Sequence, residues 1–233
     1  MKMINRVWML FLSAVLSAGA VGCGCMESPA EKKIVAEMEE KYGEEFRFVE
    51  WRTLNFGSES CTAHLECDSF PGKLIKAGRE TARDGDMIYF DNYMGYFYED
   101  AIRAELESAV ECVYPESKVL FLVASCQFPR DMGPEMSAED IVHDKDTLLA
   151  AMILVEQQSE NRDQEQQLEQ LRSELEERRF RMDANLFLVS DGEVFEEINE
   201  SNYSDWTARD DWFSGRCYFA TDQNYDFLYA NWR

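Results

Sequence analysis

Residues 119–125, with the sequence VLFLVAS, form an almost continuous apolar run in the middle of the chain. A strand that is buried on both faces has such a run, because neither of its faces needs polar residues. The run therefore predicts a buried strand, and we expect this strand to lie at the centre of the sheet.

A long helix is predicted directly before this strand, over residues 93–114. Its apolar residues recur at steps of three and four, which places them on one helical face. These residues are Met94, Tyr98, Ile102, Leu106, Val110 and Val113. Pro115 then ends the helix, because proline lacks the amide hydrogen that a helix interior needs.

Four strands with short connecting turns are predicted nearer the N-terminus, over residues 45–53, 61–67, 73–79 and 87–90. Strands joined in this way pair antiparallel. A helix over residues 29–42 precedes them. Ser28 caps its first turn, Pro29 occupies its first position, Glu31 completes a capping box, and Gly43 ends it.

The segment after residue 135 contains further helices and strands. Ser137 caps a short helix that reaches about His143. Residues 147–155 favour a strand, although their leucines and alanines also suit a helix. Another strand is predicted over 185–190, with a turn at Asp191 and Gly192. Residues 217–221 and 226–232 are expected to pair as the closing strands.

Residues 156–182 form the most polar predicted helix of the chain. Leu168 and Leu175 fit one heptad register, which Asn161 breaks, and Leu171 lies at the alternate seam position. We interpret the segment as a surface helix that lies on the sheet. The alternative is a seam for a partner helix, in which case these leucines would be exposed.

These elements predict an α+β fold, a mainly antiparallel sheet with helices packed on it, that follows a cleaved N-terminal signal peptide. Residues 1–22 are assigned to the signal peptide and residues 23–28 to a short tether. Residues 29–233 are expected to form a single globular domain. The alternative is two lobes, over about 29–135 and 136–233.

The N-terminus has the charge pattern of a secretory signal, with Lys2 and Arg6 before an apolar stretch over residues 7–22. That stretch is shorter than the roughly 20 residues that a membrane-spanning helix needs. Ala20-Val21-Gly22-Cys23 resembles the lipobox of bacterial lipoproteins, although the family more often has Leu at the position of Ala20. The resemblance implies that Cys23 becomes the mature N-terminus and carries lipid, with fatty acids such as palmitate.

Other readings of this N-terminus remain open. Cys25 offers a second, weaker register for lipid attachment. Ordinary secretion after the small residues of 18–20 would release a soluble chain, and an uncleaved anchor is a third reading. Lipid attachment at Cys23 would hold the domain close to the bilayer, because five extended residue steps to Ser28 span at most about 17 Å.

The chain is strongly acidic, with 46 Asp and Glu against 23 Lys and Arg and a net charge of −23. Nucleic-acid binding depends on Lys and Arg that displace counterions, so this composition argues against a nucleic-acid partner. It argues equally against docking on anionic lipids through a basic patch. Solubility at a crowded surface, or a cationic partner, fits the charge better.

The seven cysteines do not form the dense pattern of a disulfide scaffold. Cys61 and Cys67 lie on one face of a predicted strand, about 20 Å apart, which is too far for a disulfide bond. We expect mostly buried thiols. The disulfide states of six cysteines stay open at this point: Cys25, Cys61, Cys67, Cys112, Cys126 and Cys217.

No residue pattern predicts a catalytic site, a metal site or a cofactor site. His64 and Glu66 share one strand face, as an acid–base pair would, but a solvated strand face is the simpler interpretation. Cys61 faces away from His64, which argues against a cysteine nucleophile. Asp84, Asp86 and Asp91, with Asn92, cluster near a turn but lack the spacing of a calcium loop.

The C-terminal 31 residues are rich in aromatic side chains, including Trp206, Trp212 and Trp232. Exposed rings of this kind bind glycans or peptides, whereas rings in strands usually fill a core. Core packing is the preferred interpretation. The segments around Trp206 and over residues 210–213 look like loops, which leaves some rings free for a protein, peptide or glycan partner.

Two further segments, residues 40–46 and Asp91-Asn92-Tyr93, resemble those of small, acidic, uncharacterised lipoproteins of Gram-positive bacteria. The resemblance implies no activity. The sequence therefore favours a membrane-tethered, extracytoplasmic lipoprotein on the cell membrane, with a non-enzymatic binding or accessory role. The alternative is an envelope-acting enzyme, such as a hydrolase, whose active site the sequence does not identify.

Overall fold

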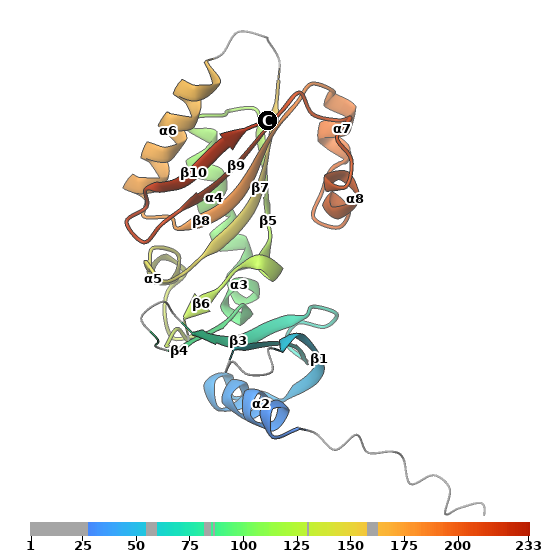
Figure 1. Ribbon diagram of the computed structural model, residues 1–233, viewed down its shortest axis with the longest axis vertical. Coiled ribbons are helices and arrows are strands. Elements are labelled where there is room, and N and C mark those ends of the chain that lie inside the picture. Colours follow the sequence, from blue (N-terminus) through green and yellow to red (C-terminus); the bar gives the residue numbers. More distant parts are fainter. Residues whose placement is uncertain (1–27, 55–59, 82–84, 86, 130, 158–162) are drawn as a thin grey trace, which may run out of the picture.

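The chain folds into two five-stranded sheets with helices packed on them, which confirms the predicted α+β class. The structure is a computed structural model, and it describes residues 28–54, 60–81, 85, 87–129, 131–157 and 163–233. The molecule is elongated. The first sheet, sheet A, lies at one end of the long axis, and the second, sheet B, occupies the other end (Figure 1).

Sheet A is antiparallel throughout and has the strand order β1-β2-β3-β4-β6. Its strands are β1 (Phe46–Leu54), β2 (Cys61–Cys67), β3 (Ile75–Thr81), β4 (Met87–Asp91) and β6 (Phe128–Pro129). The first four follow one another in sequence, as predicted. The fifth, β6, is a two-residue strand outside the predicted strands.

Helix α2 (Pro29–Tyr42) covers the outer face of sheet A and has the predicted bounds. Ser28 and Glu31 form both hydrogen bonds of the capping box, and Gly43 ends the helix in the left-handed region at a φ of 69°. Ile34 and Met38 are its buried side chains. They pack onto the sheet face that carries the buried residues Ala63 and Ala77.

Sheet B has the strand order β10-β9-β8-β7-β5, and only β7 and β8 pair in parallel. Its strands are β5 (Ser117–Phe121), β7 (Leu149–Glu156), β8 (Met182–Val189), β9 (Gly215–Thr221) and β10 (Phe227–Trp232). The ambiguous segment 147–155 is therefore a strand, as preferred. The predicted pairing of the two closing strands is also confirmed.

The expectation that residues 119–125 form the central strand is wrong. Strand β5 lies at the edge of sheet B, ends at Phe121, and is followed by a short 3₁₀ helix, η1 (Val123–Ser125). The run is apolar because helices cover both faces of this edge. Val119 and Phe121 pack into the main core, and Leu120 packs into a second cluster on the opposite face.

The predicted helix over 93–114 is two helices, α3 (Tyr93–Phe97) and α4 (Glu99–Glu111). Tyr98 separates them with backbone angles of −113° and 25°, outside the helical region. Helical backbone hydrogen bonds continue across Tyr98: Tyr98 N donates to Met94 O, and Ile102 N donates to Tyr98 O. The apolar spacing is therefore kept, although the helix is interrupted.

Helix α6 (Gln164–Glu177) is shorter than the predicted helix over 156–182, because Glu156 ends β7 and Met182 begins β8. It forms the crossover between these parallel strands. Leu168, Leu171 and Leu175 are buried in the main core, so α6 lies on the sheet, as interpreted. The partner-helix alternative required these leucines to be exposed, and the structure contradicts it.

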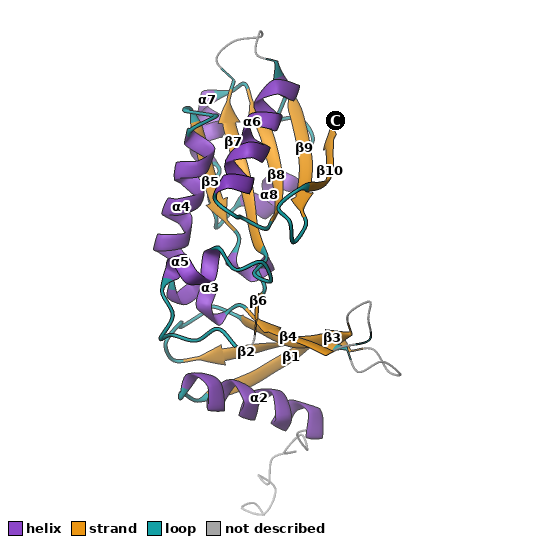
Figure 2. Cartoon of the chain, turned by 90° about the vertical axis from the view of Figure 1, so that its left-hand side faces the viewer, coloured by secondary structure: helices purple, strands orange, loops and turns teal. Residues whose placement is uncertain are grey.

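Sheet B is covered on both faces. Helices α4 and α6 lie on one face, and α7 (Gly192–Glu197) and α8 (Tyr203–Thr207) lie on the other (Figures 1 and 2). A turn was predicted at Asp191 and Gly192, and in the structure Asp191 is the N-cap of α7, which begins at Gly192. Helix α5 (Ala138–Val142) is capped by Ser137, as predicted.

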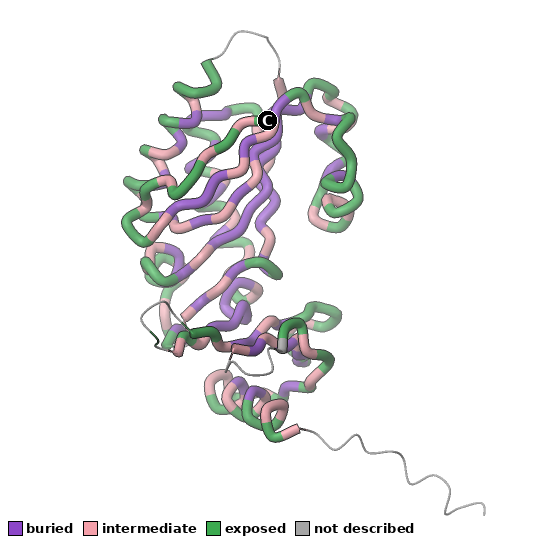
Figure 3. The backbone as a smooth tube through the Cα atoms, in the orientation of Figure 1, coloured by how far each residue is buried: buried purple, intermediate pink, exposed green. Residues whose placement is uncertain are grey.

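One main hydrophobic core includes buried residues of both sheets, and Figure 3 shows buried segments along the length of the molecule. The chain passes from sheet A to β5 in sheet B, returns to sheet A with β6, and passes again to sheet B with β7. Neither sheet is therefore one continuous segment of sequence. Within the described residues, no helix has the length and the apolar character that crossing a membrane requires.

Candidate functional site

His64 and Glu66 lie on one face of β2, as predicted, but they do not form a pair. Nδ1 of His64 lies 3.1 Å from Oε1 of Glu50, which is opposite it on β1. Glu66 is exposed and lies opposite Arg47. The Glu50 carboxylate is itself more than half exposed. This arrangement is a solvated strand face and does not form a catalytic cluster.

Only two residues of the predicted aspartate cluster lie among the described residues. Asp84 and Asp86 lie outside the described residues, whereas Asp91 and Asn92 are buried. Asn92 Nδ2 donates to Val123 O at 3.1 Å, and its Oδ1 accepts from Lys76 N at 2.7 Å. Among the described residues, no three His, Cys, Asp or Glu side chains are placed to hold a metal ion.

Five cysteines lie in the described part of the chain, all as free thiols, and four of them are buried. Cys61 and Cys67 stand at opposite ends of β2 and face the core, away from His64. Burial raises the pKa of Cys126 to about 12 and that of Cys217 to about 11, so both remain protonated at neutral pH. Cys112, at the end of α4, is exposed.

The buried aromatic residues of the C-terminal segment are Trp206, Trp212 and Phe219, as the preferred core packing predicts, whereas Tyr229 is exposed. Trp206, which belongs to α8, and Trp212 are buried in the second cluster, where Trp212 Nε1 donates to Trp206 O at 2.8 Å. The Trp212 and Phe187 rings lie 4.6 Å apart. The expectation that the segments around Trp206 and residues 210–213 leave rings free is therefore wrong for both tryptophans.

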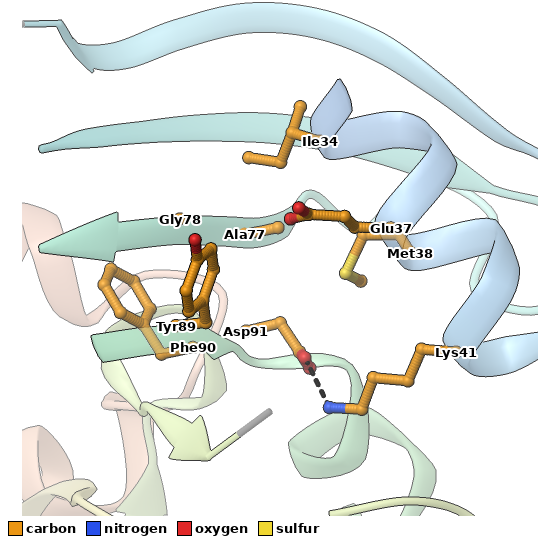
Figure 4. Close-up of a pocket in the computed structure, with 9 residues that line it drawn as sticks. All are labelled: Ile34, Glu37, Met38, Lys41, Ala77, Gly78, Tyr89, Phe90 and Asp91. Atoms are coloured by element: carbon orange, nitrogen blue, oxygen red, sulfur yellow. Dashed lines mark hydrogen bonds and ion pairs between the residues drawn. The ribbon is translucent and has the colours of Figure 1, made fainter. Parts of the chain in front are cut away.

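One open pocket of about 300 Å³ lies between α2 and sheet A (Figure 4). Glu37 and Lys41 reach into it from the helix, and Tyr89, Phe90 and Asp91 line it from β4. Gly78 forms part of its floor. A Cβ atom at this glycine would lie 2.6 Å from Cys61 O, so the close approach of β2 and β3 requires glycine here.

Asp91 is the polar centre of this pocket. Its carboxylate accepts hydrogen bonds from Lys41 Nζ at 2.8 Å, Tyr42 OH at 2.8 Å and Tyr93 N at 3.0 Å. Burial, and then the negative charge of Asp91, raise the pKa of Tyr42 far above its usual range. Because protein donors already surround the carboxylate, this group fixes α2 to sheet A and leaves little capacity for a ligand.

A larger cleft of about 660 Å³ lies between the two sheets. Aromatic residues of β4 and β6 line it, and Asp146 and Arg181 reach it from the segments that precede β7 and β8. Arg181 Nη1 donates to Asp146 O at 3.4 Å, and Asp146 Oδ1 accepts from Gln223 Nε2 at 2.8 Å. Glu80 adds a further acid, so charges of both signs face the cleft and favour no single class of ligand.

The face of sheet B that carries α7 and α8 also has, near the β10 edge, a pocket of about 420 Å³ that is distinguished by its charge. Arg216 and Tyr218 on β9, with Asn231 and Arg233 at the end of β10, line it. We call these four residues the two-arginine pocket. They form two neighbouring cross-strand pairs, Arg216 with Arg233 and Tyr218 with Asn231.

The arginines of this pocket carry the strongest functional signal, and sequence reasoning missed them. A β-bulge between Phe227 and Tyr229 shifts the register of β10 by one residue. With the bulge, Arg233 lies opposite Arg216, whereas a regular hairpin would place Trp232 there. In the sequence, the two arginines are only the residues directly before one predicted closing strand and directly after the other.

Comparisons with known proteins place the chain in no characterised group. No family model matches it, and no curated protein matches it. One solved structure, that of a DUF5037 family protein from Ruminococcus gnavus, aligns with a TM-score of 0.37 and 14% sequence identity. The alignment covers 85% of this chain and 94% of that one. A likeness of this strength carries no argument about function.

Proposed function

We propose that the protein is an extracytoplasmic lipoprotein, anchored to the cell membrane through lipid on Cys23, with a binding or accessory role. The observation that carries the proposal is the sequence Ala20-Val21-Gly22-Cys23, which follows a charged and then apolar N-terminus. Two acyl chains hold a protein stably at a membrane, whereas a single chain holds it only marginally.

The shape of the domain supports this arrangement. Helix α2, where the described chain begins, lies at the sheet A end of the long axis, and the end of β10 lies toward the opposite end (Figure 1). Only five residue steps separate Cys23 from Ser28, at most about 17 Å of extended chain. A domain tethered in this way holds sheet A next to the bilayer and projects sheet B away from it.

The described residues favour binding over catalysis. The candidate acid–base residues His64 and Glu66 do not contact each other, and the buried thiols Cys126 and Cys217 have raised pKa values, whereas catalytic thiols need lowered ones. A preorganised polar pocket on sheet B, far from α2, suits a protein that presents a binding surface away from the membrane.

Intact mass spectrometry of membrane and soluble fractions tests the anchor. The native chain is expected in the membrane fraction, starting at Cys23 and carrying diacylglycerol. Cys23→Ala should remove the lipid and change the fraction in which the chain is found. Cys25→Ala is the matched control and should leave the lipidated species unchanged. A native chain that is soluble and starts at Val21, or a lipid that is lost only in Cys25→Ala, would overturn lipid attachment at Cys23.

A further inference from the structure

Arg216 and Arg233 form a hydrogen-bonded cross-strand pair at the edge of sheet B. Arg216 N donates to Arg233 O at 3.0 Å, and Arg233 N donates to Arg216 O at 2.8 Å. Residues that exchange both backbone hydrogen bonds lie directly opposite each other, with Cα atoms about 5.5 Å apart and side chains on the same face. Two cationic side chains therefore stand side by side on this face.

Like charges placed directly opposite on neighbouring strands destabilise a sheet. In this chain acids outnumber bases by two to one, with 46 Asp and Glu against 23 Lys and Arg. Nevertheless, within the part of the chain that the structure describes, neither guanidinium lies within ion-pair distance of a carboxylate. The positive charge of the pair is therefore available to a ligand.

Neighbouring side chains hold Arg216 in place before any ligand arrives. Its Nε and Nη2 both donate to Oδ1 of Asn185, at 3.1 and 2.7 Å. Its guanidinium carbon lies 5.2 Å from the centre of the Phe187 ring. These contacts use one edge of the guanidinium and leave Nη1 without a hydrogen-bond partner among the described residues. A fixed arginine loses less conformational entropy when it binds an anion.

Two neutral polar groups complete the pocket. Tyr218 and Asn231 form the adjacent cross-strand pair and line the same hollow. The Tyr218 hydroxyl donates to Asp183 Oδ2 at 3.0 Å and accepts from the Tyr229 hydroxyl at 2.9 Å. Asp183 is the nearest acid on this face of β8, and its carboxylate oxygen is engaged by Tyr218. The Asn231 amide, which has no side-chain partner among the described residues, is available to donate to an anion.

We propose that the two-arginine pocket binds the phosphate group of a phosphate monoester, with Arg216 and Arg233 each donating to its oxygens. The two guanidinium groups attract an anion, and phosphate oxygens accept the paired N–H donors that arginine presents. The inference deepens the proposed binding role, on which it rests, by naming the class of ligand. It also places the site at the end of the molecule away from α2.

Calorimetric titration of the full chain in detergent micelles tests the site, with inorganic phosphate and O-phosphoserine as separate probes and chloride at equal ionic strength as the reference. The native chain should bind phosphate saturably. Tighter binding of O-phosphoserine than of inorganic phosphate supports a monoester ligand, and binding of inorganic phosphate alone overturns that part of the proposal.

The Arg233→Gln variant identifies the binding residues. The Arg233 side chain makes no contact that the described fold requires, so the variant should fold normally and, without ligand, be at least as stable as the native chain, because it removes one of two opposed like charges. Its affinity for phosphate should fall by at least about tenfold, the effect of losing a hydrogen bond to a charged group. Arg216→Gln should weaken binding at least as much.

Arg47→Gln is the matched control, because Arg47 is an exposed strand arginine on sheet A, paired with Asp68 at 2.9 Å. It removes the same charge and should leave phosphate affinity unchanged. Equal losses in Arg47→Gln and Arg233→Gln, or no saturable binding by the native chain, would overturn the site. Neither result alters the membrane fractionation, so failure of this site and failure of the lipid anchor are distinguishable.

Discussion

Lys41 Nζ at the end of α2 lies 2.8 Å from Asp91 Oδ2 at the end of β4, and both side chains are almost completely buried. The pair joins two elements that are 50 residues apart in sequence. Burial of an ion pair is costly unless its remaining hydrogen-bonding groups are satisfied, and Tyr42 and Tyr93 satisfy those of Asp91. The pair therefore fixes the position of α2 on sheet A.

The Asp91→Ala substitution is expected to lower the free energy of unfolding by about 3–5 kcal/mol, because it leaves the Lys41 ammonium buried without its partner. Urea denaturation followed by circular dichroism measures the change. Lys33→Ala is the control on the same helix, since Lys33 and Glu37 form an exposed pair at 3.9 Å. It should cost less than about 1 kcal/mol. Equal effects of the two substitutions would show that the buried pair has no special role.

Leu171 on α6 is expected to be a core residue and not part of an interface. Leu171→Ala should lower the free energy of unfolding by about 2–5 kcal/mol, because it leaves a cavity between α6 and sheet B. Gln170→Ala, at the exposed neighbouring position, should change stability by less than about 0.5 kcal/mol. If Leu171→Ala left stability unchanged and altered the oligomeric state instead, the leucines would belong to a partner seam.

Alkaline pH is expected to destabilise the fold through its buried thiols. Burial raises the pKa of Cys126 to about 12, whereas an unfolded cysteine titrates near pH 8.5. Between these values the unfolded chain releases a proton that the folded chain keeps, so stability falls as pH rises. In this range each such thiol lowers the free energy of unfolding by about 1.4 kcal/mol per pH unit. Below about pH 8.5 the stability that the buried thiol contributes is fully present.

The loss of stability caused by thiol titration is best measured between about pH 8.5 and 10, because free tyrosines titrate only near pH 10. Denaturation at several pH values should give a flatter decline for Cys126→Ala than for the native chain. Cys112→Ala replaces an exposed thiol and should reproduce the native slope. A Cys126→Ala slope identical to the native one would contradict the assignment of the decline to this thiol.

The predicted elements near the N-terminus agree with the structure because their signals are local. Helix α2 has its cap, its first proline and its terminal glycine within its own sequence, and β2 shows strict alternation of buried and less buried residues. The position of β5 in its sheet has no such local signal. Its apolar run reports burial on both faces, but it cannot distinguish coverage by strands from coverage by the helices that flank an edge strand.

The two-arginine pocket was not predictable for a related reason. The closing hairpin was predicted, but the pairing of Arg216 with Arg233 depends on one extra residue in the bulge between Phe227 and Tyr229. A one-residue change of register also moves every side chain of a strand to the opposite face. Sequence periodicity cannot fix such a bulge, so the candidate site emerged only from the three-dimensional register.

The proposed arrangement joins an anchor next to sheet A with a binding site on sheet B, and one distance measurement tests it most directly. Two labelled proteins are compared, and Cys25 is replaced by Ser in both. One carries a fluorophore on the native Cys112, which follows α4. The other combines Cys112→Ser with Lys33→Cys, so that its fluorophore is attached to α2.

Each protein is reconstituted in vesicles whose lipid headgroups carry a quencher. An anchor next to sheet A predicts strong quenching of the label on α2 and little quenching of the label on Cys112. Equal quenching of the two labels, or stronger quenching at Cys112, would contradict it.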